Sequence, residues 1–314
     1  MMHSSILIVE DLWKSYGETK AVQGLTFELS KGEFFGLLGP NGAGKTTTIG
    51  LLTGLIEPDR GHVTIDGIDL FLRPMEAKAK LGLVPQNFAL YPTLSARDNL
   101  VFFGSIYGLK GKHLEERIMS VLEIVALSDR AHQTVATFSN GMKRRLNIAA
   151  GLLHEPDLLI LDEPTVGVDT QSRMAILESL RSLNQSGVTL LYTTHYIEEA
   201  QRLCDRVAIM DQGKIIALDR PVQLIRDFGK GMIHMEVYGV VDELLIEQMT
   251  PLGSVRIIDG QPSILQIETE RVDQTSREVL ELMKTREGQL KTLSLSEPNL
   301  ETVFIHLTGR TLRD

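Results

Sequence analysis

The chain has 314 residues, 43% of them hydrophobic, which is ordinary for a globular protein and enough for two domains. Its formal net charge of −9 argues against broad nucleic-acid binding, which requires a basic face. No apolar run approaches the ~18–20 residues that cross a bilayer, and the first residues lack the basic start and apolar core of a signal peptide. The single cysteine, Cys204, excludes an intramolecular disulfide framework, so we expect a cytoplasmic protein.

The first part of the chain is predicted to lead into a phosphate-binding loop. Apolar and alternating segments predict short strands at 6–9 and 27–29, and the apolar run at 33–38 predicts a buried strand. Residues 39–46 then read GPNGAGKT and fit the pattern G-x-x-x-x-G-K-[ST], and a helix is predicted over 47–52. Strand, glycine loop and helix in this order are the context that such a loop requires.

The residue types in this loop suit a polyphosphate. Gly39, Gly42 and Gly44 carry no side chains, so backbone N–H groups can approach the anion, and the start of the next helix offers further N–H groups. Lys45 supplies a cation for the outer phosphates, and the Thr46 hydroxyl can ligate magnesium. The alternative interpretation is a glycine-rich turn in an ordinary α/β domain.

The middle of the chain is predicted to be an α/β structure with a helical insertion. Strands are expected at 62–67 and 81–85, and apolar residues at spacings of three and four predict helices between 95 and 127. Near-continuous apolar strands then alternate with helices, which implies a parallel sheet buried on both faces. These strands are expected at 158–161, 188–192 and 206–210, and the helices at 171–184 and 197–204.

A smaller α+β region is expected after Pro221, where no further nucleotide-type motif occurs. Its patterns predict strands at 233–238 and 263–268, a helix at 276–284 and an extended segment at 293–295. We place the boundary between the two regions near residues 220–230.

Polar residues follow several predicted strands and suit phosphate chemistry. Asp162 can hold magnesium through water, and Glu163 can polarise an attacking water. His195 can hydrogen-bond a γ-phosphate or that water, and the Gln86 amide oxygen can complete a magnesium shell. Tyr16 can stack on adenine. Taken singly, each has an ordinary alternative: acids that end a strand, a structural histidine, a surface glutamine and a packing aromatic.

These motifs, in this order, resemble a known family. Residues 139–146 read SNGMKRRL and open a helical pattern shortly before the strand at 158–161. Together with the glycine loop, Gln86, the acidic pair and His195, they resemble the ATP-binding subunits of ABC transporters over about residues 5–220. The tail at 297–310 resembles the C-terminal extension of the ABC-2 type exporter ATPases, a group that includes drug-export and nodulation-type ATPases.

The resemblance implies a fold and a domain organisation. The expected fold is α/β, a P-loop NTPase (RecA-like) core with an N-terminal antiparallel β subdomain and a helical insertion, plus a small C-terminal α+β domain. Residues 1–222 would form the nucleotide-binding domain, with a helical subdomain at about 88–150. Residues 223–314 would form an accessory or regulatory domain.

The resemblance also implies roles for single residues. Glu163 matches the catalytic glutamate and His195 the switch histidine, so both are expected to be catalytic. The expected magnesium ligands are Thr46, Gln86 of the Q-loop and Asp162 of Walker B. Residues 166–169 look like the D-loop. The residues expected to bind ATP are Tyr16, Gly39, Pro40, Asn41, Gly42, Ala43, Gly44, Lys45, Thr46, Thr47, Ser139 and Gly141.

The signature motif departs from the family's pattern. Residues 138–142 read FSNGM, where the family usually has LSGGQ. Ser139 and Gly141 keep the groups expected to meet a γ-phosphate. Asn140 replaces a glycine, and we expect it to be tolerated because asparagine adopts a left-handed conformation more readily than most residues.

The resemblance further implies partners. Two copies are expected to bind head to tail around two ATP molecules with Mg²⁺, each site combining one chain's glycine loop with the other's signature residues. A separate transmembrane permease is expected to hold the dimer at the inner face of the cell membrane. Residues 87–99, with Phe88 and Tyr91, are predicted to dock on this permease, and the alternative is a loop that packs on the helical insertion.

Other ATPase classes fit the sequence less well. ABC proteins that act on ribosomes carry two cassettes, whereas one set of motifs occurs here. Chromosome-maintenance ATPases insert long coiled coils between the two loops, and no sustained heptad occurs between Thr46 and Ser139. A third, non-enzymatic alternative is a nucleotide-dependent regulator whose hydrolysis is incidental, which the intact Glu163 and His195 argue against. A soluble ABC-type ATPase with a regulatory or non-transport role stays open as the alternative function. The sequence does not identify the cargo.

Overall fold

The computed structural model of the chain describes residues 4–238, 241–258, 263–284 and 290–309. They divide into two compact units, one ending at Arg220 and one beginning at Pro221. The sequence placed this division between 222 and 223. Each unit has its own sheet or sheets and its own apolar core, so each is described separately below.

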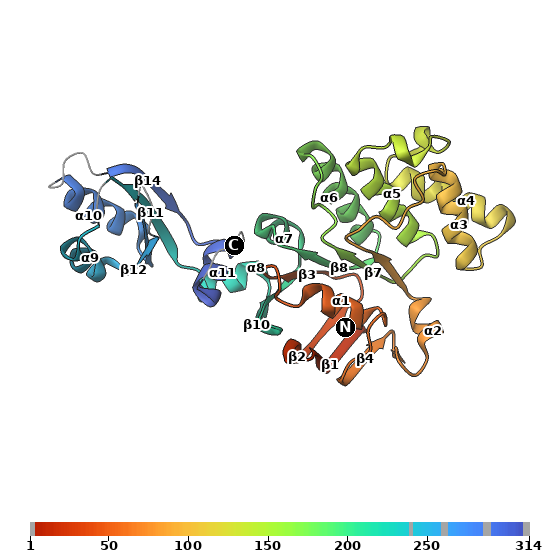
Figure 1. The fold of residues 1–314 in the computed structure, drawn as a ribbon, viewed down its shortest axis with the longest axis horizontal. Helices are drawn as coiled ribbons and strands as arrows, with labels where there is room; N and C mark the ends of the chain where they lie inside the picture. The colour runs from red at the N-terminus through yellow and green to blue at the C-terminus, as the bar shows by residue number, and fades with distance from the viewer. Residues whose placement is uncertain (1–3, 239–240, 259–262, 285–289, 310–314) are drawn as a thin grey trace. The chain divides into compact units, whose positions relative to one another are not determined.

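The first unit is built on a six-stranded sheet that is parallel except at one edge (Figure 1). Its strand order is β10-β9-β3-β8-β7-β6, and β10 runs antiparallel to β9. Almost every residue of the central strands is buried, as expected for a sheet covered on both faces. The strands are β3 (Phe34–Leu38), β6 (Leu81–Val84), β7 (Leu158–Asp162), β8 (Thr189–Thr194), β9 (Arg206–Asp211) and β10 (Lys214–Asp219).

A second, antiparallel sheet lies at the N-terminal end of this unit, as the sequence predicted. Its order is β2-β1-β4-β5, and its first two strands are long because they form one continuous hairpin. The short strands predicted at 6–9 and 27–29 are parts of these longer ones. The strands are β1 (Ser5–Tyr16), β2 (Thr19–Ser30), β4 (Arg60–Ile65) and β5 (Ile68–Asp69).

Helix α1 (Lys45–Leu52) packs between the two sheets of the first unit. One apolar cluster joins Ile49 and Leu52 of this helix to Leu25 of the antiparallel sheet and Leu158 of the parallel sheet. Because α1 begins at the last residues of the glycine loop, this core fixes the loop against both sheets.

The remaining helices of the first unit include the predicted helical insertion, which Figure 1 shows as a group formed by α3, α4 and α5 beside α6. The helical region predicted between 95 and 127 consists of two helices, because Gly108 at φ 80° and Gly111 at φ 56° turn the chain between them. The helices are α2 (Pro74–Lys78), α3 (Ala96–Ile106), α4 (Gly111–Ile124), α5 (Asn140–Leu152), α6 (Thr170–Gln185) and α7 (Ile197–Leu203), with short 3₁₀ turns at Ser128–Arg130 and Val135–Thr137.

The second unit contains a four-stranded antiparallel sheet with the order β12-β13-β11-β14. Strand, helix, strand, strand, helix, strand is the element order of a ferredoxin-like fold, preceded and followed here by one helix each. The elements are α8 (Pro221–Phe228), β11 (Gly231–Val237), α9 (Glu243–Met249), a 3₁₀ turn at Thr250–Leu252, β12 (Ser254–Ile258), β13 (Ser263–Thr269), α10 (Val272–Lys284), β14 (Leu290–Ser296) and α11 (Leu300–Thr308).

The core of this unit forms on one face of its sheet. Ile233 and Met235 of β11 and Leu265 of β13 pack against Leu245 of α9 and Val279 of α10. The sequence predicted β11, β13, α10 and part of β14 but not α9, β12 or α11. In the part of the chain that the structure describes, no helix has the length and apolar character needed to cross a membrane.

Candidate nucleotide-binding site

The glycine loop lies between β3 and α1, as predicted, and its glycines are required by the space around them. Gly44 has φ 103°, and a Cβ atom there would lie 2.3 Å from the carbonyl oxygen of Ala21. A Cβ atom on Gly39 would lie 2.5 Å from the carbonyl oxygen of Met210. The loop therefore runs so close to β2 and β9 that side chains at these two positions are excluded.

The loop presents donors to an anion. Lys45 Nζ donates to the carbonyl oxygens of Gly39 at 2.7 Å and Pro40 at 3.1 Å, which fold the lysine side chain back along the loop. No side chain caps the first turn of α1 at Gly44. The N–H groups of this turn are therefore available to phosphate oxygens, and the helix dipole favours negative charge there.

Strand β7 ends in the predicted acidic pair. Asp162 is only 5% exposed, and Thr193 Oγ1 of the neighbouring strand donates to its Oδ1 at 2.8 Å. Burial raises the pKa of the Asp162 carboxyl, the Thr193 hydrogen bond lowers it, and the nearby Glu163 raises it further. The same Thr193 oxygen accepts the Glu163 N–H at 2.9 Å, so one hydroxyl orders both acids.

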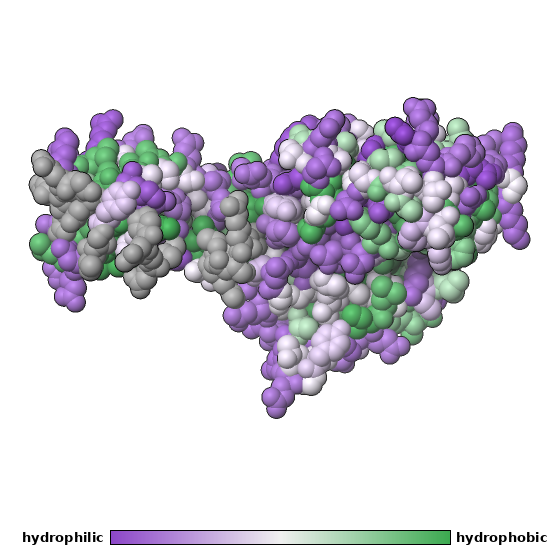
Figure 2. Space-filling model, turned by 45° about the horizontal axis from the view of Figure 1, so that its top comes forward, coloured by the Kyte–Doolittle hydropathy of each residue, from purple (hydrophilic) through white to green (hydrophobic). Residues whose placement is uncertain are grey.

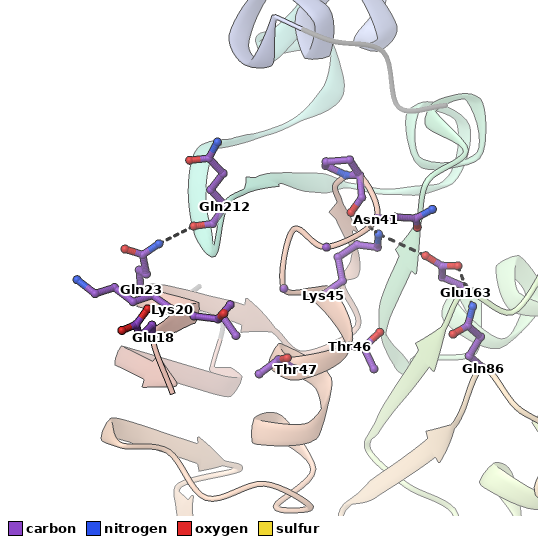
Figure 3. Close-up of a pocket in the computed structure, with 15 residues that line it drawn as sticks. Glu18, Lys20, Gln23, Asn41, Lys45, Thr46, Thr47, Gln86, Glu163 and Gln212 are labelled. Atoms are coloured by element: carbon purple, nitrogen blue, oxygen red, sulfur yellow. Dashed lines mark hydrogen bonds and ion pairs between the residues drawn. The ribbon is translucent and has the colours of Figure 1, made fainter. Parts of the chain in front are cut away.

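Three other predicted site residues lie around Glu163, and Figure 3 shows two of them, Lys45 and Gln86. Its Oε1 lies 3.3 Å from Lys45 Nζ. Its Oε2 accepts a hydrogen bond from Gln86 Nε2 at 3.2 Å and lies 3.5 Å from His195 Nδ1. Glu163 also has a φ of 45°, a strained conformation for a residue with a side chain, which turns its carboxylate toward these three groups.

These residues border a cavity of about 600 Å³, a size that accommodates a nucleotide. Most of the predicted glycine loop lines it, together with Thr46, Thr47, Gln86 and Glu163. Asp162 and His195 lie behind this lining, next to Glu163. The full lining is Glu18, Thr19, Lys20, Ala21, Gln23, Pro40, Asn41, Gly42, Gly44, Lys45, Thr46, Thr47, Gln86, Glu163 and Gln212.

One wall of this cavity was not predicted from the sequence. It comes from β2 and from the turn after β9, where Gln23 Nε2 donates to the carbonyl oxygen of Gln212 at 2.7 Å (Figure 3). No local signal marks these residues, because the pairing joins segments 189 positions apart. Tyr16 does not line the cavity, although Glu18 next to it does, and its side chain is half exposed.

The signature residues form the start of α5. Ser139 is its N-cap, and its hydroxyl accepts the Met142 N–H at 3.2 Å. Asn140 is the first residue of α5 and does not have the left-handed conformation that we invoked, so that reason for expecting it to be tolerated is wrong. Glycine is needed instead at Gly141, where a Cβ atom would lie 2.2 Å from Ser172 Oγ. Ser139 and Gly141 do not line the cavity.

The predicted D-loop, 166–169, leads directly into α6. Asp169 is the N-cap of this helix and accepts the Ser172 N–H at 2.9 Å, which lowers the pKa of its carboxyl. Asn140 Nδ2 donates to the carbonyl oxygen of Gly167 at 3.4 Å. The start of α5 and the D-loop are therefore adjacent.

A contact that the sequence did not suggest holds the Q-loop. Arg144 of α5 donates to the carbonyl oxygens of Pro85 at 2.9 Å and Gln86 at 2.7 Å, and its guanidinium lies 4.8 Å from the centre of the Phe88 ring. Burial lowers the pKa of Arg144, and the nearby Asp162 carboxylate partly opposes this shift. The helix that carries the signature residues therefore also fixes Gln86.

The donor set fits Mg²⁺ shared with phosphate. Thr46, Gln86 and Asp162 offer a hydroxyl, an amide and a carboxylate oxygen, the ligand types that this ion prefers. Among the described residues, no group of three or more histidine, cysteine or acidic side chains could hold a metal alone. An ion here would thus need oxygens from a bound phosphate, as in other P-loop sites.

Comparison with known proteins agrees with this geometry. The family model described as ABC transporter matches residues 22–166. The linearmycin resistance ATP-binding protein LnrL of Bacillus subtilis is 44% identical over 98% of this chain and 100% of its own length. A Nod factor export ATP-binding protein I of Cupriavidus pinatubonensis is 41% identical over 99% of this chain and 93% of its own.

Solved structures resemble the first unit. The ATP-binding subunit of an ABC transporter superposes with a TM-score of 0.65 and 34% identity over 71% of this chain and 93% of its own. CbiO1 of Clostridium perfringens, part of the ABC transporter complex cbiONQ, superposes with a TM-score of 0.66 and 28% identity. The match covers 71% of this chain and 91% of CbiO1. The dimeric ATP-binding cassette MJ0796, in a post-hydrolysis state with ADP and phosphate, superposes with a TM-score of 0.62 and 26% identity. The match covers 68% of this chain and 98% of MJ0796.

The chain is similar over nearly its whole length to two ATP-binding proteins, and it has a P-loop, two acids at the end of a buried strand and a cassette fold. The chain belongs to the ATP-binding proteins of ABC transporters, and it binds and hydrolyses ATP as the subunit that powers a transporter.

Proposed function

We propose that two copies of this chain close head to tail around two ATP molecules, and that closing and reopening drive a separate permease at the inner face of the membrane. The observation that carries this proposal is the division of the predicted site. The glycine loop, Gln86 and Glu163 line one cavity, whereas Ser139 and Gly141 do not. A second copy facing the cavity would bring its Ser139 and Gly141 to the exposed side of the nucleotide.

In this proposal, five of the predicted site residues have a role in binding or hydrolysing ATP. Lys45 neutralises the outer phosphates, and the N–H groups of the glycine loop bind their oxygens. Glu163 orients and deprotonates the attacking water as a general base. His195, 3.5 Å from Glu163, holds that carboxylate and the γ-phosphate in one geometry. Mg²⁺ on Thr46 and Asp162 would neutralise charge that develops on the phosphates.

Glu163 has three partners, which keep its carboxylate engaged until ATP binds. Its ion pair with Lys45 and its hydrogen bond from Gln86 occupy both oxygens. Phosphate binding would draw Lys45 away, since an anion of higher charge competes for the same cation. Glu163 would then be released toward the water. Arrival of substrate and activation of the base are linked in this way.

The permease is proposed to bind beside the Q-loop. Phe88 is 38% exposed and Tyr91 46% exposed, and the Tyr91 ring packs edge-on against Phe102 at 4.8 Å between ring centres. Figure 2 shows one face of the molecule, on which hydrophilic side chains are interspersed with hydrophobic ones. Arg144 donates to the Gln86 carbonyl oxygen and packs on the Phe88 ring. A partner bound at Phe88 would therefore be connected through Arg144 to Gln86, which lines the cavity.

The head-to-tail arrangement can be tested by complementation between two inactive variants. In a Lys45→Ala chain the glycine loop is impaired, and in a Ser139→Ala chain the signature is impaired. Each homodimer should be inactive, but a mixture should regain ATPase activity because the mixed dimer contains one site with an intact loop and an intact signature. If each chain carried a complete site of its own, mixing would restore nothing.

The docking surface can be tested on the complex. Phe88→Glu with Tyr91→Glu should prevent co-purification with the membrane protein encoded beside this chain, because it buries two charges in an apolar contact. Ile216→Glu on β10, also an exposed apolar residue, is the matched control. Normal assembly of the double variant would show that residues 87–99 only cover the helical insertion.

A further inference from the structure

A buried carboxylate lies directly behind the proposed catalytic residues. Glu199, on α7 and one turn after His195, is 3% exposed. Its Oε2 accepts hydrogen bonds from the hydroxyls of Thr165 and Thr194, both at 3.1 Å, and of Tyr192. Its Oε1 accepts from Arg173 Nε at 2.5 Å. One carboxylate therefore receives four donors.

The four donors come from the segments that form the site. Thr165 is two residues beyond Glu163, in the turn that follows β7. Tyr192 and Thr194 are on β8, and Thr194 directly precedes His195. Arg173 is on α6, where its N–H donates to the carbonyl oxygen of Asp169 at the end of the D-loop, 2.8 Å away. Glu199 is the common acceptor of the three segments.

The same contacts reach His195. The Thr194 hydroxyl donates to Glu199 and accepts the Tyr196 N–H at 2.9 Å, which fixes the turn that contains the histidine. The Arg173 guanidinium, held by Glu199, lies 4.1 Å from the centre of the Tyr196 ring. That ring in turn packs against the His195 ring, with 4.3 Å between centres. His195 is therefore linked to this network through Thr194 and Tyr196.

The network needs a negative charge at its centre. Four donors point at the carboxylate, and an ionised carboxylate is a pure acceptor with room for about four hydrogen bonds. A glutamine amide of the same shape would lose the charge that Arg173 pairs with, and its NH₂ group would fit only if a hydroxyl of the network turned from donor to acceptor. A buried donor without an acceptor is costly, so the surrounding side chains would have to move.

We infer that Glu199 is a positioning residue: its carboxylate fixes the His195 turn and the first turn of α6 relative to Glu163. This inference rests on the proposed roles of Glu163 and His195. Glu199 does not border the cavity, and the hydrogen bonds that its carboxylate accepts come from side chains of the network, so it acts through His195 rather than on the substrate. Loss of the carboxylate should change turnover more than ATP binding, because the glycine loop has no part in the network.

The first experiment compares two adjacent glutamates of α7. Glu199→Gln in the full-length chain should lower kcat by about tenfold to a hundredfold, because misplacement of a catalytic group by an ångström has effects of this size. KM for ATP should change less than about twofold. Glu198→Gln is the matched control, since Glu198 is exposed on the same helix, and it should behave as wild type. Equal kcat for Glu199→Gln and wild type would overturn the inference.

A double-mutant cycle shows whether Glu199 acts through His195. His195→Ala alone should lower kcat, and Glu199→Gln should then add little to that loss, because the group it positions is already gone. If Glu199→Gln lowers kcat as much in the His195→Ala background as in the wild type, the inference fails while the role of His195 stands. If His195→Ala leaves kcat unchanged, the proposed role of His195 is wrong. A kcat loss in Glu199→Gln would then be caused by displacement of another residue.

Two further variants guard against a folding defect. Tyr192→Phe keeps the ring and removes one donor, and Arg173→Lys keeps the charge but removes the planar group over Tyr196. Both should fold and bind ATP normally, with smaller kcat losses that again depend on His195. If both variants retain full kcat, the network only stabilises the fold and the inference is wrong.

Discussion

The parallel sheet of the first unit and the antiparallel sheet of the second unit place polar side chains differently. In the parallel sheet of the first unit, β7 ends at Asp162 and β8 is followed directly by His195, so the polar groups lie beyond the carboxyl ends of the strands. In the antiparallel sheet of the second unit, Gln266 and Glu268 lie within β13 itself. Glu268 pairs there with Arg256 at 3.5 Å and with His306 at 3.4 Å.

The difference follows from strand direction. Parallel strands joined by crossover helices all end at the same edge, so residues far apart in sequence are brought to one site. Antiparallel strands end at alternate edges, and their polar residues are paired where they lie. The first arrangement gathers groups that are free to act on a ligand, whereas the second satisfies its charges internally. The predictions below test this contrast between the two units.

The largest effect is expected at Glu163. Glu163→Gln should reduce kcat for ATP hydrolysis by about a hundredfold or more, the range that a general base contributes, while ATP still binds. Because hydrolysis no longer reopens the dimer, the variant should also accumulate as an ATP-bound dimer. Phosphate release gives kcat, and light scattering after size-exclusion chromatography gives the mass with and without ATP.

The control for this variant is Glu198→Gln, which makes the same chemical change on an exposed residue of the first unit. It should leave both turnover and oligomeric state unchanged. Near-normal turnover in Glu163→Gln would remove this residue as the base, and the strand ends of the first unit would then lack their main catalytic group.

The contrast also explains how much the sequence could predict. The glycine loop, the acidic pair after 158–161 and the histidine at 195 carry their chemistry in short local patterns. The apolar strands around them predicted the parallel sheet, because such runs occur in strands buried on both faces. Once the fold gathers strand ends at one edge, these local patterns are enough to assemble most of the site.

Other features depend on contacts that no local pattern records. The wall formed by Gln23 and Gln212 joins two segments that are 189 positions apart in the sequence. The tolerance expected for Asn140 was argued from a left-handed conformation, but the residue lies in the first turn of a helix capped by Ser139. Glu199 looks like any helix acid until its four donors are seen. In the second unit, α9 has seven residues, which is too short for a helical pattern to stand out.

A second prediction separates the two cores. Leu265, fully buried at the centre of the second unit's sheet, belongs to an apolar cluster that shares no residue with the cluster around α1. Leu265→Ala should destabilise the second unit by about 2–5 kcal/mol through lost burial and a cavity. The affinity for ATP should stay the same. Urea unfolding and ATP titration of the full-length chain measure the two effects.

Thr292→Ala is the control for this substitution, because Thr292 is exposed on β14 of the same sheet. It should change stability by less than about 0.5 kcal/mol. A loss of ATP affinity in Leu265→Ala would contradict the view that the two units have independent cores.

A third prediction concerns Lys45. Lys45→Ala should weaken ATP binding by about tenfold to a hundredfold, the range for loss of a hydrogen bond to a charged group. The substitution also removes the cation beside Glu163, so some of the loss comes from repulsion between that carboxylate and the phosphates. Lys112→Ala on α4, where the side chain is 91% exposed, is the control. Equal ATP affinity in the Lys45 variant and the wild type would show that the loop does not hold the phosphates as proposed.

The smallest effects are expected from one half-buried histidine in each unit. His154 stacks on Tyr107 with 3.7 Å between ring centres, and His234 lies 3.3 Å from Gln266 Nε2. Burial lowers the pKa of both histidines, and Glu301 partly opposes the shift at His234. Above the unfolded pKa of about 6.5 both are neutral in the folded and unfolded chain, so their contribution to stability is constant there.

As the pH falls below about 6.5, the unfolded chain takes up protons that the folded histidines resist, so stability decreases until the pH reaches the folded pKa values. His154→Gln and His234→Gln each remove one titrating group. His154→Gln should therefore flatten the decrease in the free energy of unfolding of the first unit, and His234→Gln that of the second unit. Urea unfolding between about pH 7 and pH 5 measures the slope, which cannot exceed about 1.4 kcal/mol per pH unit and site. A variant curve parallel to that of the wild type would mean that the histidine is equally easy to protonate in both states. The two units would then differ in where they place polar groups but not in how strongly they bury them.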